Sequence, residues 1–403
     1  MSPTAPRLLA AAGTLLLFGL LICLLEKTDY RLVYVVLAGV LLVVGSNLIQ
    51  GWQIGLYAPV SGSAYTGELV PIATEGQEYY HDVLRIQDPK QLLFHYNEEN
   101  VKLNQHSHTH PPGAIFLFYG LLKLLRHPGL VSLFIAIVSV SFSAFLLHRL
   151  LLTEVNPRTA RFATFLFLLL PAVQIYYLAT LDALIATVLL GVLYCLRRSD
   201  QRKYLWLAAL LLIISFTLTF VSLFILPVLV LFELVDRRSL RRSSFLLVGL
   251  VGFHLAACLL LGYNAWLSFR AASHFENPHG FMLLVDPVNY LFTRLEDVFE
   301  LAVFLGPWLL LLIVREIRSQ WRSRSPLLTR SLLGIATLLG MFLTGAFRTG
   351  ETARAAIFIF PYFLIPIALL LHRLKPTRSE RWQLASLVFA HTVLMQLIGN
   401  YFY

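Results

Sequence analysis

Three carboxylates and two tyrosines stand close together in the sequence EGQEYYHD, which begins at Glu75. Glu75, Glu78 and Asp82 fall within about two helical turns, beside Tyr79 and Tyr80. A carboxylate within hydrogen-bond reach of a hydroxyl can act as a general base, and a partly apolar site raises its pKa towards neutrality. We therefore expect this segment to present a base to a sugar or hydroxyl acceptor. The alternative is a solvated amphipathic helix on a membrane surface, anchored by its tyrosines.

Three histidines, His106, His108 and His110, alternate with other residues just before Pro111. In an extended strand their imidazoles would share one face, a spacing compatible with metal ligation. Pro111 restricts His110 to extended geometry. The sequence shows no further ligand, so the favoured interpretation is that these histidines hydrogen-bond the loop or contact substrate.

Charged residues also stand at the ends of two apolar segments. Asp182 follows the run YYLATL, where an ionisable residue is either a functional group or a helix cap. Further along, Arg294 is followed by Glu296, Asp297 and Glu300. Pairing of Arg294 with Asp297 is the structural alternative to a charge that faces a site.

Two arginines, Arg348 and Arg354, flank Glu351 in the sequence RTGETAR, which leads into another apolar run. Guanidinium groups bind phosphate oxygens in a bidentate geometry, so the pair could clamp an anionic phosphate. Because Glu351 stands between them, a local ion pair is the alternative.

The composition identifies a membrane protein. The chain has 403 residues, of which 58% are hydrophobic and 13% charged, and its mean hydropathy is +0.72. A soluble protein of this length could not hide so much apolar surface. The net charge of +10 resides in short connectors between apolar runs, which is how orientation in a membrane is set. This distribution argues against nucleic-acid binding.

We expect an all-α polytopic membrane protein with about 11–13 transmembrane helices, forming a single domain over 1–403. The first apolar run has no clear signal-peptide cleavage site and is interpreted as a membrane helix. The candidate spans are 8–25, 32–50, 112–126, 128–149, 160–177, 179–196, 204–219, 220–236, 243–264, 288–314, 328–346, 353–372 and 382–400.

Basic connectors near 197–203, 237–242, 315–330 and 373–381 belong on the cytoplasmic side. The polar segment 51–112 is then a large extracytoplasmic loop early in the chain.

Because this loop lies outside and the first basic connector, near 197–203, lies inside, the chain between them must cross the membrane an odd number of times. We therefore expect 112–126 to enter the membrane only partly, or to form one bent unit with 128–149.

The order of these features resembles the C-type, multi-spanning glycosyltransferases that use polyprenyl-phosphate-linked sugars. Protein O-mannosyltransferases and the lipid A aminoarabinose transferase belong to this group. The matching features are an acid before a tyrosine in an early outside loop, a Pro-Pro pair, a Pro–Tyr–Asp stretch, the sequence FLGP, and a late Gly-Glu-x-x-Arg. They correspond in this chain to Glu75 with Tyr79, Pro111-Pro112, Pro171 to Asp182, Phe304 to Pro307, and Gly350-Glu351 with Arg354.

The chain departs from this pattern at its first acid. Glu75 is followed by glycine rather than by a second acid, so Glu78, Asp82 or Glu68 stays open as the functional carboxylate. An additional apolar run also precedes the segment that matches the first span of the family.

The resemblance implies transfer of a sugar, for example mannose or another hexose or pentose, from a polyprenyl-phosphate carrier. The acceptor would be an extracytoplasmic lipid, glycan or protein, and a single displacement would invert the anomeric carbon. The catalytic candidates are Glu75, Glu78, Asp82 and Asp182, and the candidates for substrate or phosphate binding are Arg348, Glu351, Arg354, Arg294, Tyr79, His108 and His110. No cofactor is required by the sequence, and a divalent metal at His106, His108 and His110 stays open.

Two other classes of protein compete with this interpretation. A ligase or polymerase of surface glycans also uses lipid-linked sugars, although its main outside loop usually comes late in the chain. A secondary transporter typically shows internal repeats, and none is evident here. We expect location in a bacterial plasma membrane, among membrane lipids, with the site on the extracytoplasmic face.

Overall fold

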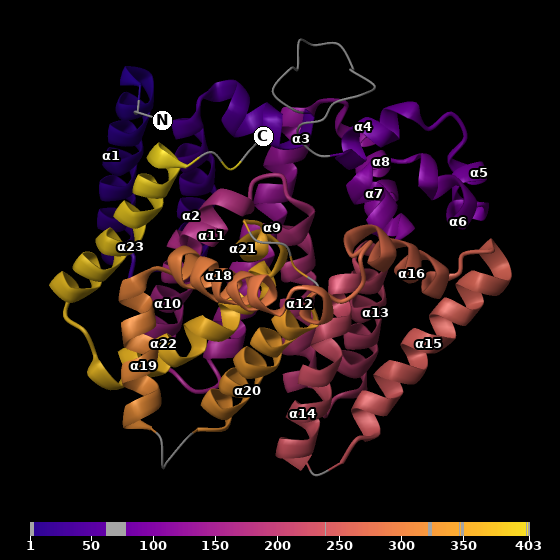
Figure 1. The fold of residues 1–403 in the computed structure, drawn as a ribbon. Helices are drawn as coiled ribbons and strands as arrows, with labels where there is room; N and C mark the ends of the chain where they lie inside the picture. The colour runs from indigo at the N-terminus through magenta and orange to yellow at the C-terminus, as the bar shows by residue number, and fades with distance from the viewer. Residues whose placement is uncertain are drawn as a thin grey trace.

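A computed structural model describes residues 4–61, 78–237, 239–320, 325–345, 347, 350–399 and 401. Every regular element among these residues is helical (Figure 1), which confirms the all-α prediction. The helices of the first half are α1 (Ala5–Lys27), α2 (Leu32–Asn47), α3 (Ala58–Ser61), α4 (Glu78–Arg85), α5 (Pro89–Phe94), α6 (Tyr96–Glu99), α7 (Gln105–Thr109), α8 (Pro112–Leu125), α9 (Pro128–Leu151), α10 (Pro157–Leu169), α11 (Pro171–Tyr176) and α12 (Leu181–Arg197).

The second half continues with α13 (Arg202–Leu218), α14 (Ile225–Arg237), α15 (Arg241–Leu261), α16 (Ala265–Glu276), α17 (Met282–Val285), α18 (Pro287–Leu305), α19 (Pro307–Ser319), α20 (Pro326–Gly340), α21 (Thr352–Ala355), α22 (Phe360–Leu374) and α23 (Arg378–Ile398). Short 3-10 turns extend several of them, among them η5 (Met341–Thr344) after α20.

Six helices in the described part of the chain are long and apolar enough to cross a bilayer, and they make this a multi-pass membrane protein. They are Ala5–Lys27, Leu32–Gln50, Pro128–Leu151, Arg241–Leu261, Pro326–Thr344 and Ile357–Leu374. A bent pair, α18 and α19, would make a seventh. The sequence predicted 11–13 spans. The difference arises because breaks divide several apolar runs into helices that are too short to cross a bilayer on their own.

One such break interrupts the span expected over 288–314. α18 and α19 are bent by 99° relative to each other. Gly306, with φ of +95°, and Pro307 form the junction. Glycine tolerates this backbone conformation, and proline cannot donate the next helical hydrogen bond. α18 therefore lies across the bundle while α19 runs along it (Figure 1).

The helix α8 is separate from α9 and shorter than a bilayer crossing. It has 14 residues, about 21 Å at 1.5 Å per residue, against roughly 30 Å of hydrocarbon. Arg126, with φ of 57°, ends α8 just before α9 begins. This short helix fits the expectation that 112–126 does not fully cross.

The described part of 51–112 is mostly short helices, and it lies at one end of the bundle. Figure 1 shows α4 to α8 at the top of the molecule, while the ends of α14 and α19 and the starts of α15 and α20 lie at the bottom. The described acidic and histidine-bearing segment is therefore at the opposite end of the bundle from the helix ends that flank these two basic connectors.

A buried hydrogen-bond network supports the break between α10 and α11. Gln174 donates through Nε2 to the carbonyl of Leu168 at 2.5 Å, and its Oε1 accepts from the Ser46 hydroxyl at 2.9 Å. Asn47 donates to the carbonyl of Gln174 at 2.6 Å. Burying these amides is favourable only because their polar atoms are paired. The network fixes α11, which carries Tyr176 and precedes Asp182.

Candidate functional site

Three charged or titratable side chains, from three separate segments, meet around the guanidinium of Arg354. We call the four residues the Arg354 cluster: Arg354 and Glu351 next to α21, Asp182 at the start of α12, and His106 in α7. Nε of Arg354 lies 3.6 Å from Oδ2 of Asp182, and Nη2 lies 3.0 Å from Oε2 of Glu351. Nη2 is also 3.5 Å from Nε2 of His106. The Arg354 and Asp182 side chains keep 22% and 24% exposure, so ligands can reach them.

The turn that carries Arg354 is held by carboxylates of α18. Glu300 accepts hydrogen bonds from the backbone N–H groups of Thr352 at 3.2 Å and Ala353 at 2.9 Å. Asp297 accepts from the Thr352 hydroxyl at 2.6 Å. These contacts satisfy the first N–H groups of α21, which have no partner within the helix. α18 therefore fixes where Arg354 points.

Arg294 belongs to this support and does not line the cavity beside Arg354. It is 9% exposed and pairs with Asp297 at 3.1 Å. Its guanidinium also donates to the carbonyls of Phe342 at 2.7 Å and Phe347 at 3.0 Å. The pairing alternative considered from sequence is thus the arrangement present, with Arg294 holding the chain before α21.

A cavity of about 570 Å³ opens beside Arg354. It is lined by Tyr176, Glu296, Phe299, Glu300, Val303, Phe304, Gly350, Glu351, Arg354 and Tyr401. The Tyr176 and Phe304 rings stack with centroids 5.4 Å apart, and the Tyr401 ring meets Phe304 edge-on at 5.8 Å. The cavity therefore combines an aromatic wall with three carboxylates and one guanidinium.

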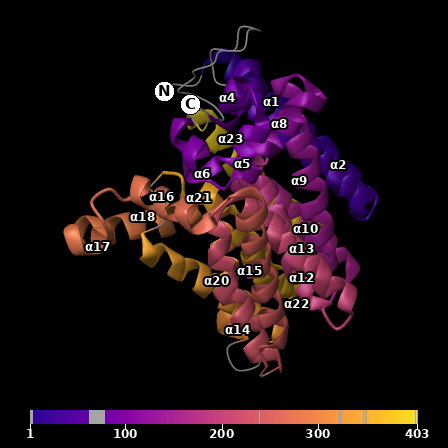
Figure 2. The ribbon, with the colours of Figure 1, turned by 90° about the vertical axis from the view of Figure 1, so that its right-hand side faces the viewer.

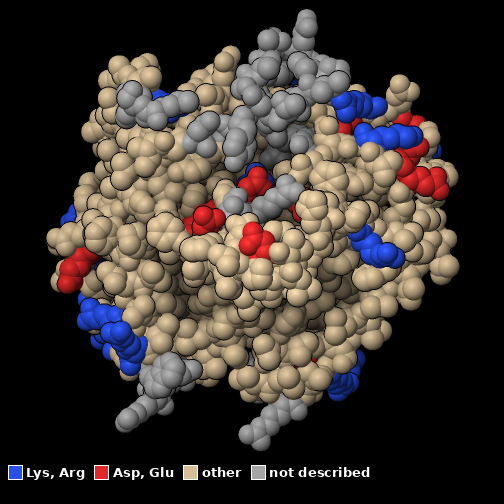
Figure 3. All heavy atoms as spheres, viewed as in Figure 1, with Lys and Arg blue, Asp and Glu red and all other residues tan. Residues whose placement is uncertain are grey.

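The surface around this region is mainly acidic and apolar. Figure 3 shows acidic side chains near the middle of one face, whereas the basic side chains lie towards its edges. This pattern agrees with the three glutamates that line the cavity.

The three histidines do not share one face, because the extended strand considered for metal ligation is not present. Residues 105–109 form a helical turn, in which residues two apart point about 200° away from each other. His106 turns to Arg354, whereas Nδ1 of His108 lies 3.1 Å from the carbonyl of Asn100. His108 also packs on Phe275 of α16 with ring centroids 5.4 Å apart. This contact is the loop-holding role that the sequence favoured, and the described residues contain no group of three candidate metal ligands.

His110 and Tyr79 pack together behind His106. His110 has the extended backbone, φ −114° and ψ 158°, that Pro111 predicts. The Tyr79 ring stacks on Phe118 at 5.4 Å and meets the His110 ring edge-on at 5.5 Å. Burial is the main reason that the pKa of His110 is lowered to about 3, and the neighbouring His106 contributes to the same shift. His110 is therefore neutral at physiological pH.

Asp82 is enclosed within the α4–α7 segment. Its side chain is fully buried, and its two carboxylate oxygens accept from the backbone N–H of Asn104 at 3.1 and 3.3 Å. Arg85 lies 3.7 Å away. Asp82 thus ties α4 to the turn that precedes α7.

Several candidates cannot be placed. Glu68, Glu75 and Arg348 lie outside the described residues. Glu78 begins α4, but its side chain is not described.

The aromatic wall was not predicted from the sequence. Tyr176 stood in a recognised stretch before Asp182, but no local signal joins it to Phe304 and Tyr401, which lie more than 100 residues further along. Burial raises the pKa of Tyr401 to about 12, so its hydroxyl stays protonated and can donate a hydrogen bond.

Comparisons with protein-family models, with curated proteins and with solved structures gave no match to this chain. The geometry of the site must therefore carry any functional assignment.

Proposed function

We propose that this protein is a membrane glycosyltransferase that moves a sugar from a polyprenyl-phosphate carrier to an extracytoplasmic acceptor by inverting single displacement. The observation that supports this most is the Arg354 cluster at the mouth of the aromatic cavity. A single guanidinium flanked by carboxylates, beside rings that can stack on a sugar, matches what this reaction requires.

Arg354 would bind the departing phosphate. During transfer the bond between the anomeric carbon and the phosphate oxygen breaks, and its electron pair goes to the phosphate. A guanidinium placed beforehand next to that oxygen stabilises the developing charge. Glu351 and Asp182 hold the planar group from two sides, so little reorganisation is needed when the phosphate arrives.

A carboxylate would take the proton from the acceptor hydroxyl as the hydroxyl oxygen attacks the anomeric carbon. Asp182 and Glu351 are the described carboxylates of the cluster, and Glu75, Glu78 and Asp82 are the further candidates from the early loop. Asp182 is well placed to orient the sugar or the acceptor, because it lies 3.6 Å from Arg354, which lines the aromatic cavity.

The topology that we propose puts the end with α4–α7 outside and the basic connectors inside. α9, the pair α10–α11, and α12 then make three crossings between the early loop and the connector at Arg197. That odd number satisfies the positive-inside rule. The bent pair α18–α19 and the helices α13, α14 and α23 would be further crossings, which brings the number of spans closer to that expected from the sequence. In this orientation the site faces the extracytoplasmic side of a bacterial plasma membrane.

The test is donor consumption by the purified chain in proteoliposomes. A panel of polyprenyl-phosphate sugars, each with a labelled hexose or pentose, is supplied, and release or transfer of the label is measured. Arg354→Gln is expected to lower the rate about 100-fold or more, the usual cost of removing a group that stabilises developing charge.

Arg158→Gln is the matched control, because Arg158 pairs with Asp29 at 2.9 Å in a separate ion pair and does not line the cavity beside Arg354. It is expected to keep nearly full activity. Wild-type protein that consumes no donor in the panel, or an Arg354→Gln variant with unchanged turnover, overturns the proposal.

A further inference from the structure

The two faces of α16 differ in what they contact. Ser268, Ala272 and Phe275 are spaced as one helical face, and Ser268 and Ala272 are buried. Ser268 accepts a hydrogen bond from Asn97 of α6 at 2.9 Å, and Phe275 packs on His108 of α7. This face attaches α16 to the α4–α7 end of the bundle.

The opposite face carries a stripe of hydrogen-bonding side chains. Arg270, Ser273, His274 and Asn277 follow the spacing i, i+3, i+4 and i+7, which brings them onto one side of a helix. All four line a cavity of about 550 Å³, together with Trp266, Phe269, Gly280, Phe281 and Thr344. Within the described part of the chain, none of the four side chains makes a hydrogen bond or ion pair. Their donors are therefore available to a ligand.

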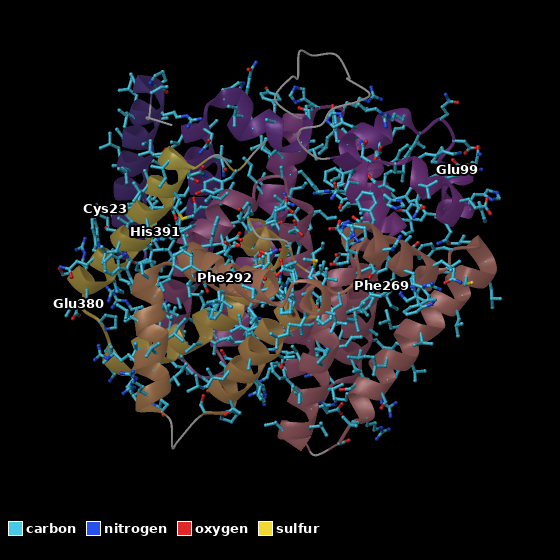
Figure 4. The ribbon with its side chains drawn as sticks, viewed as in Figure 1. Cys23, Glu99, Phe269, Phe292, Glu380 and His391 are labelled. Atoms are coloured by element: carbon cyan, nitrogen blue, oxygen red, sulfur yellow. The ribbon has the colours of Figure 1, made fainter. Side chains whose placement is uncertain are left out.

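The cavity has an aromatic side as well as a cationic one. Trp266 and Phe269 stack with ring centroids 5.8 Å apart, and Phe281 closes the other wall by meeting Tyr290 edge-on at 5.5 Å. Figure 4 labels Phe269 on α16, and Figure 2 shows α16 to α18 projecting from the side of the bundle. Indole and guanidinium groups together are typical of the boundary between lipid headgroups and hydrocarbon.

The helices on either side of α16, which are α15 and α17, carry exposed apolar side chains that would face lipid. α15 ends at Leu261, and Gly262, with φ of +69°, turns the chain directly into α16. Val248, Val251, Leu255 and Leu259 follow one face of α15 and are all strongly exposed, Leu259 by 85%. Leu284 of α17, three residues after Phe281 in the cavity wall, is also 83% exposed. An acyl chain can therefore lie along α15 while its headgroup reaches Arg270.

We propose that the cavity between α16, the turn that precedes α17, and η5 is a binding site for an anionic phospholipid, whose phosphate is held by Arg270 with Ser273, His274 and Asn277 as hydrogen-bond partners. The lipid belongs to the leaflet at the α4–α7 end of the bundle. The exposed apolar residues of α15 are the reason for assigning a lipid rather than free phosphate. The acyl chains of a lipid would contact them, whereas a soluble anion would not. The site is separate from the Arg354 cluster and does not depend on sugar transfer.

The test measures lipid binding to the purified full chain in a neutral detergent. Native mass spectrometry counts bound phosphatidylglycerol and, in a parallel arm, phosphatidylcholine and inorganic phosphate. The wild-type chain is expected to retain phosphatidylglycerol in preference to the other two. Arg270→Gln is expected to weaken phosphatidylglycerol binding about fivefold, which corresponds to roughly 1 kcal/mol for one basic residue at a membrane surface.

Arg270→Lys keeps the charge and is expected to retain most of the binding, while Ser273→Ala gives a smaller loss in the same direction. Arg241→Gln is the matched control, because Arg241 is an exposed arginine at the opposite end of α15. An equal loss in Arg241→Gln, equal binding of phosphatidylcholine, or competition by inorganic phosphate overturns the proposal. Thermal unfolding of each variant without added lipid separates loss of binding from loss of fold.

Discussion

Arg354 is a charged side chain that contacts its neighbour Glu351 and two residues from distant parts of the sequence, His106 and Asp182. Its contacts are directional: Nε faces Asp182, and Nη2 faces Glu351 and His106. A guanidinium can make these contacts at once because its donors lie in one plane, whereas an ammonium group is a compact point charge. The identity of the cation, and not only its charge, is therefore expected to matter.

This geometry predicts the result of replacing Arg354 by lysine. Arg354→Lys keeps the positive charge but loses the planar fork, so donor consumption in proteoliposomes is expected to fall at least tenfold. Lys102→Arg, at an exposed ion pair with Glu99, is the control and should leave turnover unchanged. Equal turnover in Arg354→Lys and wild type would show that charge alone suffices.

His110 predicts a dependence of stability on pH. Its pKa is about 3 in the folded chain and about 6.5 when unfolded. Between these values the unfolded chain binds a proton that the folded chain does not, so stability falls as the pH drops from 6.5 towards 3.

His110→Gln removes this proton uptake. In thermal unfolding of the detergent-solubilised protein, the variant is expected to lose less stability than wild type between pH 6.5 and pH 4. His279→Gln, at an exposed histidine in the turn before α17, is the control and should keep the wild-type slope. A His110→Gln variant with that same slope contradicts the assignment.

The sequence predicted which ionisable residues belong to the site, but not the directions in which the side chains of the histidines point. Asp182, Glu351 and Arg354 were chosen as ionisable groups at the ends of apolar runs, and they meet. For His106, His108 and His110, an extended strand with one shared face was considered, and contacts with the loop or with substrate were favoured. The helical turn at 105–109 divides the three histidines instead. Local backbone conformation in a short polar segment depends on tertiary contacts such as the Tyr96 hydroxyl, which donates to the carbonyls of Ser107 and His110.

At the scale of elements, α18 is the support on which the site is built. Its charged residues Arg294, Asp297 and Glu300 lie at i, i+3 and i+6, and each bonds the chain between η5 and α21. The sequence predicted helical structure here but a straight span. Periodicity continues through Gly306-Pro307, so only the backbone conformation of glycine reveals the 99° bend.

The link between α18 and α21 can be weakened at one hydroxyl. Thr352→Val has nearly the same shape but leaves Oδ1 of buried Asp297 without its 2.6 Å hydrogen bond. The expected loss of stability is about 1–3 kcal/mol, the cost of an unsatisfied buried acceptor. Thr352→Ser keeps the hydroxyl and is expected to stay close to wild type in thermal unfolding. Equal stability of the valine and serine variants would show that this bond contributes nothing.

At the scale of the whole molecule, the candidate sites and the basic connectors lie in different parts of the bundle. The Arg354 cluster and α16 both contact α7 through His106 and His108, on the side of the molecule that carries α4–α7, whereas the helix ends that flank the basic connectors of α14–α15 and α19–α20 lie at the other end (Figure 1). The charge pattern of the sequence predicted this division, because basic connectors mark one side of a membrane. The same charge pattern also led to the expectation that 112–126 enters the membrane only partly, which the short α8 fits. It could not predict that α11 breaks off from α10, since that break depends on packing.

The proposed orientation predicts which end an impermeant reagent reaches in intact cells. Cysteine is introduced in a background without Cys23, Cys195 and Cys258 at Glu98, which is 81% exposed at the α4–α7 end, or at Arg241, which is exposed at the start of α15. Because 78–111 is assigned to the outside, Glu98→Cys is expected to react with a membrane-impermeant maleimide in intact cells. Arg241→Cys is expected to react only after the membrane is opened. The reverse pattern would place the Arg354 cluster on the cytoplasmic side and overturn the extracytoplasmic reaction proposed for it, while leaving the lipid site at Arg270 open to its own binding test.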